Sequence, residues 1–168
     1  MDYVNNKFRA QAIGYISGFV VKMLQKIVKC SECMTVCYGE LDGSLKMYRT
    51  LLTLKNKGGL IIPSADVIKI CVITDSIICY LNKIKNDEIF NKSLDLKISQ
   101  LLLKKFKMDE MFTQLNDHDF DHKISLIRAT AICYTKIKKF HIIKLLNQKK
   151  TDSSIRKRLS RIIINKCQ

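Results

Sequence analysis

The sequence predicts an all-α protein, a compact bundle of about five to six helices with one irregular segment that contains cysteines. Proline occurs once and glycine six times in 168 residues, so the chain has few helix breakers. Apolar residues make up 47% of the chain and recur at the three- and four-residue spacing of helices. Together with 27% charged residues, this composition is typical of a globular chain that is long enough to bury a core.

The first helix is expected over residues 8–28, where apolar side chains form a single stripe. Gly14 and Gly18 lie four residues apart on this helix, so we expect a neighbouring helix to pack closely there. A cysteine cluster follows, and then an irregular segment with one short extended piece. Three thiols fall within eight positions of this cluster, at Cys30, Cys33 and Cys37.

A central buried helix is expected from Ala65 to about Asn82. Pro63 disfavours helical geometry at the residue before it. Ser64 is then a good N-cap, and apolar residues cover most of the surface of the helix that follows.

Three further helices are expected before residue 150. Ser93 is predicted to cap the first, a short helix follows over 109–115, and a long helix runs over about 120–147. No apolar run approaches the roughly 18 residues of a membrane span, so the chain is expected to be soluble and intracellular. The expected partner is DNA rather than a membrane. The predicted organisation is a helical domain, residues 1–150, and a basic C-terminal helix, residues 151–168, that packs on it or extends from it.

Positive charge is concentrated toward the end of the chain. The net charge is +15, and from Lys136 onward there are eleven Lys and Arg residues and a single acid, Asp152. Such an asymmetric field attracts polyanions, nucleic acid first and an anionic membrane surface second. The alternative is a solvated, lysine-rich surface without a specific partner.

The cysteine cluster predicts three alternatives: a zinc site, a redox pair or ordinary buried thiols. A Cys-x-x-Cys pair supplies half of a tetrahedral zinc site, and only three histidines are present to complete it. His122 and His141 are separated by about 28 Å along one helix and cannot share an ion, whereas His118 and His122 lie four residues apart on one helical face. The predicted zinc ligands are Cys30, Cys33, His118 and His122, with Cys37 as an alternative fourth ligand.

The redox alternative lacks the βαβ context that is usual for such a pair. The chain also contains no Gly-rich phosphate loop, no Gly-x-Ser-x-Gly and no Cys/His nucleophile pair with an evident orienting group. Its acids cluster where helix caps and solvated turns are expected. We therefore do not expect the chain to be an enzyme in its own right.

Three blocks of sequence, in this order, resemble the C-terminal region of P element-type transposases, which include the THAP-domain-containing transposases. They are "AIGYISGFVVKML" followed by Cys-x-x-Cys, "LLTLKNKGGLIIPSADVIKIC", and "YTKIKKFHIIKLLNQKKTDSSIRKRLSRIIINKCQ". The middle block, with "KNKGGLIIPSADVIKI", is the most specific. The resemblance covers most of the chain from residue 11 to residue 168.

In that family a THAP zinc domain reads DNA, and an RNase H-like domain, interrupted by a GTP-binding insertion, holds the acidic catalytic residues. We expect this chain to begin after the RNase H-like core, because no stretch of it resembles those parts and none of their residues can be carried over. The resemblance implies a fragment or domesticated remnant of a transposase that acts in the nucleus on or near DNA.

Two functions from different classes follow. In the first, the chain is a non-catalytic domain that contacts DNA phosphates, without reading the base sequence, and packs against the other transposase domains. In the second, it is a protein-interaction or oligomerisation module that does not bind DNA directly. The expected phosphate-contacting residues are Lys138, Lys139, Lys149, Lys150, Arg156, Lys157, Arg158 and Arg161.

Overall fold

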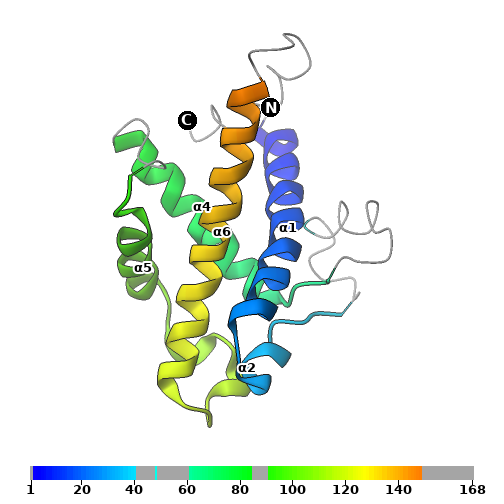
Figure 1. Ribbon diagram of the computed structural model, residues 1–168, viewed down its shortest axis with the longest axis vertical. Helices are drawn as coiled ribbons and strands as arrows, with labels where there is room; N and C mark the ends of the chain where they lie inside the picture. The colour runs from blue at the N-terminus through cyan, green and yellow to red at the C-terminus, as the bar shows by residue number, and fades with distance from the viewer. Residues whose placement is uncertain (1, 41–47, 49–60, 85–90, 149–168) are drawn as a thin grey trace.

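Five α-helices form the framework of the described residues, which are 2–40, 48, 61–84 and 91–148 of the computed structural model (Figure 1). The only β pairing in this part is an isolated bridge between Tyr38 and Pro63, so the all-α prediction is confirmed. None of the described helices combines the length and apolarity needed to cross a membrane. The helices are α1 (Asp2–Ile27), α2 (Ser31–Thr35), α4 (Ala65–Ile84), α5 (Leu94–Lys105) and α6 (Phe120–Gln148).

The two helices α4 and α6 form the centre of the bundle. In Figure 1, α6 crosses in front of α4, with α1 on one side and α5 on the other, and each of the two central helices packs against all three of the other long helices. This confirms the prediction that the helix beginning at Ala65 is central and buried. The largest fully buried side chains include Tyr134, Phe112, Leu24, Ile68, Ile70, Ile78, Ile98 and Leu102.

The start of α4 follows the sequence prediction. The backbone N–H of Val67 donates to the hydroxyl oxygen of Ser64 at 3.4 Å, as expected for an N-cap. The chain just before this cap pairs with the cysteine segment, because Gly39 N–H donates to the Ile62 carbonyl at 2.8 Å and Ser64 N–H donates to the Cys37 carbonyl at 2.8 Å. The cysteine segment is thereby tied to the beginning of the central helix.

The cysteine segment is not irregular throughout, because part of it forms the short helix α2. Cys30 is its N-cap residue, and the Cys30 carbonyl accepts the Met34 N–H at 3.1 Å. Glu32 lies in the first turn, where a negative charge is favourable. Helix α1 also differs from expectation, since it begins at Asp2 rather than near residue 8.

The short helix expected over 109–115 is instead a pair of 3₁₀ turns, η2 (Met108–Glu110) and η3 (Thr113–Leu115). They are separated at Phe112, whose φ of 45° is left-handed and costs a non-glycine residue roughly 1–2 kcal/mol. The Phe112 side chain is fully buried, and its N–H donates to Asp66 Oδ2 at 3.2 Å. Burial and this hydrogen bond offset the backbone strain, which periodicity alone could not reveal.

The predicted cap at Ser93 is absent, whereas the predicted close packing at Gly14 is present. Ser93 precedes α5 as expected, but its hydroxyl bonds to Asn91 Oδ1 at 2.9 Å and does not cap the helix. At Gly14, the close neighbour is the backbone of Tyr48. A Cβ atom at Gly14 would stand 1.7 Å from the Tyr48 carbonyl oxygen, so only glycine fits there.

A buried carboxylate, Asp75 of α4, joins the three helices α1, α4 and α6. Tyr134 donates its hydroxyl to Asp75 Oδ1 at 2.8 Å, and the Lys138 ammonium pairs with the same oxygen. Arg9 Nε donates to Asp75 Oδ2 at 2.8 Å. Burial raises the pKa of Asp75, but the Lys138 and Arg9 charges and the Tyr134 hydroxyl outweigh it, so the net shift is downward.

Candidate metal centre

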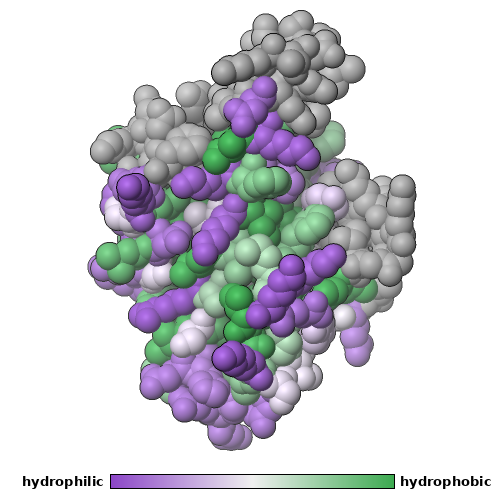
Figure 2. Space-filling model, in the orientation of Figure 1, coloured by the Kyte–Doolittle hydropathy of each residue, from purple (hydrophilic) through white to green (hydrophobic). Residues whose placement is uncertain are grey.

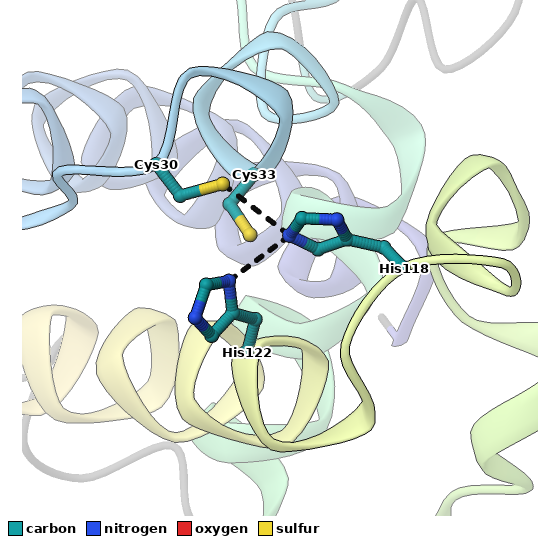
Figure 3. A group of neighbouring side chains, drawn as sticks. All are labelled: Cys30, Cys33, His118 and His122. Carbon is teal, nitrogen blue, oxygen red and sulfur yellow. Dashed lines mark hydrogen bonds between the residues drawn. The ribbon is translucent and has the colours of Figure 1, made fainter.

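Four side chains from two distant parts of the chain converge beside α2 (Figure 3). Their ligand atoms, two sulfurs and two ring nitrogens, all lie within 4.8 Å of one another. In Figure 3 the two thiols approach from α2, and the two imidazoles approach from the turn before α6 and from its first turn. The four residues are those predicted as ligands, Cys30, Cys33, His118 and His122, and they could hold a metal ion.

The spacing of the atoms agrees with a tetrahedral site. In a zinc site with bonds of about 2.0–2.3 Å, neighbouring ligand atoms lie about 3.3–3.8 Å apart. Cys30 Sγ lies 3.3 Å from His118 Nε2, and His118 Nε2 lies 3.0 Å from His122 Nδ1. These two separations are close to tetrahedral edges, and no pair of the four ligand atoms lies more than 4.8 Å apart.

Local structure brings each ligand into position. Cys30 immediately precedes α2 and Cys33 lies in its first turn, so one short helix presents both sulfurs. His118 and His122 do not share a helical face as expected from their spacing, because α6 begins only at Phe120. His118 sits in the preceding turn, where its N–H donates to the Leu115 carbonyl at 3.0 Å, and His122 lies in the first turn of α6.

The pKa values of the two thiols are shifted in opposite directions. The backbone N–H of Cys33 lowers the pKa of Cys30 to about 6. Burial opposes this shift, and hydrogen bonds with His122, Cys33 and His118 add to it. Burial raises the pKa of Cys33 to about 11, and the adjacent Cys30 adds to that rise. The pair therefore favours one thiolate and one thiol at neutral pH, and a divalent cation that binds both sulfurs would displace the remaining proton.

Neither Cys37 nor His141 belongs to the cluster. The Cys37 thiol is fully buried and donates to the Cys33 carbonyl at 3.3 Å, and burial raises its pKa to about 12. His141 lies nineteen residues beyond His122 on α6, as the sequence predicted. The alternative fourth ligand, Cys37, is thus engaged elsewhere.

The sequence did not single out Glu32, which also touches the cluster. Its Oε2 lies 2.8 Å from His118 Nδ1, the ring nitrogen that faces away from the sulfurs. The only signal available was its place between Cys30 and Cys33, which does not reveal that His118 lies nearby.

Among the expected DNA-contacting residues, Lys138 does not fit the prediction. Its side chain is buried, with the residue only 8% exposed, and its ammonium is paired with Asp75. A cation held in this way cannot reach a phosphate without leaving a buried carboxylate unpaired. Lys139 is half-buried on α6. The others lie outside the described residues: Lys149, Lys150, Arg156, Lys157, Arg158 and Arg161.

Comparison with known proteins identifies the family. Residues 3–144 match the family described as DNA transposase THAP9, C-terminal domain. The human DNA transposase THAP9 is 25% identical over 130 residues, a match that covers 73% of this chain but 14% of the human protein. No solved structure matches the chain. Because the family match extends over most of its length, the chain belongs to the family of DNA transposase THAP9 C-terminal domains.

Proposed function

We propose that this chain is a non-catalytic helical domain of a P element-type DNA transposase, either a fragment or a domesticated remnant. It contacts DNA phosphates in the nucleus and packs against the RNase H-like core of the transposase. The observation that carries the proposal is the family match over residues 3–144.

Zinc has a structural role in this proposal. Two cysteines and two histidines provide four soft and borderline donors, a set that suits zinc and fills all four tetrahedral positions. A closed site of this kind leaves no position for water or substrate, which is the arrangement of structural zinc. The ion would join α2, which follows α1 closely, to the start of α6.

Positive charge supports the DNA role. The net charge is +15, and α6 carries one acid, Asp121, against six Lys and Arg residues. Arg128, Lys136 and Lys144 are exposed on this helix. Their charge adds to that of the basic segment that follows α6 in the sequence. The proposed phosphate-contacting residues are Lys139 on α6 and, after it, Lys149, Lys150, Arg156, Lys157, Arg158 and Arg161.

The experiment is a titration of the whole chain with two duplexes of unrelated sequence over a range of salt concentrations. Phosphate neutralisation should give a linear fall of log K with log salt, with a slope of about −0.9 per contact. The combined substitution of Arg156, Lys157, Arg158 and Arg161 by Gln should weaken both complexes alike.

A matched control replaces four exposed cations elsewhere, Lys83, Lys92, Lys104 and Lys105, by Gln. This change should weaken binding less than substitution of the C-terminal cations. Salt-independent affinity, or no loss in the fourfold variant, would contradict the DNA role. The purified chain should also fail to nick or join DNA with Mg²⁺ or Mn²⁺, and metal-dependent cleavage that depends on one of its acids would contradict the non-catalytic role.

The second candidate function is a protein-interaction or oligomerisation module. Figure 2 shows a band of apolar and weakly polar residues across the face formed by α6 and α1, bordered by hydrophilic side chains. Several large apolar side chains are exposed, among them Phe8, Ile27, Tyr80, Ile84, Leu96 and Phe140. The DNA titration, together with a mass from light scattering, distinguishes the two functions, because an oligomer that does not bind DNA would favour the second.

A further inference from the structure

Glu32 makes a contact that its surroundings do not demand. Its side chain is 69% exposed and sits on a helix of five residues, yet its Oε2 lies 2.8 Å from Nδ1 of His118. The two residues are 86 positions apart in the chain. An exposed glutamate has many rotamers available, so a contact with this particular nitrogen calls for an explanation.

The contact determines which nitrogen of His118 carries the proton. A carboxylate only accepts hydrogen bonds, so the proton of a neutral imidazole is held at Nδ1, and Nε2 keeps its lone pair. Nε2 is the atom that faces the cluster, 3.3 Å from Cys30 Sγ and 3.0 Å from His122 Nδ1. Glu32 thus presents His118 in the tautomer that can bind a metal.

We infer that Glu32 is a positioning residue of the metal centre, the outer carboxylate that fixes the tautomer and ring orientation of His118. This inference rests on the proposed zinc site. Metal-bound histidines commonly donate their other ring N–H to such a carboxylate, and its loss typically weakens metal binding 10- to 100-fold.

The arrangement makes α2 responsible for three of the contacts at the centre. Cys30 comes before Glu32 in the sequence and Cys33 comes after it, and both supply sulfurs. Glu32 itself contacts His118, which precedes α6. One turn of helix and the residue before it therefore set the positions of both thiols and of an imidazole 86 residues further along the chain. A glutamate that merely occupied the first turn of a helix would interact with the backbone and would not affect a remote histidine.

The experiment measures zinc affinity of the whole chain by competition with a chromophoric chelator. Glu32→Ala is compared with wild type and with Glu110→Gln, an exposed glutamate in another short helix that pairs with Lys107. We expect Glu32→Ala to raise the Kd for Zn²⁺ about 10- to 100-fold. Glu32→Asp should recover part of the affinity, and Glu110→Gln should leave it unchanged.

Two further readouts separate positioning from a structural effect. Nitrogen chemical shifts of His118 in metal-free protein should show the Nδ1–H tautomer in wild type and a mixture of tautomers in Glu32→Ala. Denaturant unfolding of the metal-free proteins should give equilibrium constants that differ by no more than about fivefold, which corresponds to about 1 kcal/mol, the usual contribution of a first-turn charge. Unchanged zinc affinity in Glu32→Ala, or an affinity loss with no change of tautomer, would overturn the inference. Wild-type protein that binds no Zn²⁺ would instead refute the zinc site on which it rests.

Discussion

Cys30 Sγ and His118 Nε2 lie 3.3 Å apart, although the two residues are 88 positions apart in the chain. This contact connects the segment after α1 with the turn before α6. A cation bound there would join α2 to the start of α6, two elements that already pack against each other. The stability of the bundle should therefore depend on metal.

We expect purified protein to contain close to one equivalent of zinc by elemental analysis. Zinc at about 100 times its Kd adds about 2.7 kcal/mol to the free energy of unfolding, so a chelator should lower the melting temperature measurably. Cys30→Ser should release the metal, whereas His141→Ala should retain it because His141 is remote from the cluster. Metal-free protein whose melting is indifferent to chelator would show that the thiols are ordinary core residues.

Cys37→Ala should leave the zinc content unchanged and lower the free energy of unfolding by about 1 kcal/mol, because the Cys37 side chain is fully buried and apolar in character. His118→Ala should instead lose the metal, and with it the stability that bound zinc contributes. Elemental analysis and urea unfolding of the two variants provide the measurements. Zinc that persisted in His118→Ala and disappeared in Cys37→Ala would make Cys37 the fourth ligand.

Asp75→Asn should destabilise the protein by roughly 3–5 kcal/mol at pH 7, because it leaves the buried Lys138 ammonium without its counterion. Asp109→Asn, at an exposed position on η2, is the control and should change stability little. A loss below about 1 kcal/mol in Asp75→Asn would mean that solvent reaches this ion pair.

The same carboxylate predicts a pH dependence. The folded-state pKa of Asp75 is lowered, so its contribution to stability is fully present above the unfolded value of about 3.9 and is lost as pH falls through the folded value. Urea unfolding measured from pH 7 down to strongly acidic pH should show wild type losing stability faster than Asp75→Asn below about pH 4. Parallel curves would contradict the lowered pKa.

Thr74 and Thr130 offer a matched pair of buried helical threonines. In the described part of the chain, Thr74 Oγ1 has no hydrogen-bond partner, whereas Thr130 Oγ1 donates to the Leu126 carbonyl at 2.7 Å. Thr74→Val should be neutral or stabilising by up to about 1 kcal/mol, and Thr130→Val should cost about 1 kcal/mol. Equal losses in the two variants, measured by urea unfolding, would indicate that Thr74 has a partner after all.

The sequence by itself determined the all-α class, the start of the central helix and the set of four potential ligands. Helical periodicity is a local property, and Pro63 followed by Ser64 marks a helix start through backbone sterics and capping. The ligand set followed from counting, since three histidines are available and His141 lies too far along one helix from His122.

Only the tertiary structure decided which side chains meet. The burial of Lys138 against Asp75, the contact of Glu32 with His118 and the left-handed Phe112 between two 3₁₀ turns each depend on a residue that is distant in the chain. Periodicity shows which face of a helix is apolar but not which partner packs on it. Lys138, which was predicted to contact DNA, is therefore found as the buried counterion of Asp75. For the same reason, the two halves of the candidate metal centre become a single site only where α2 and the start of α6 pack together.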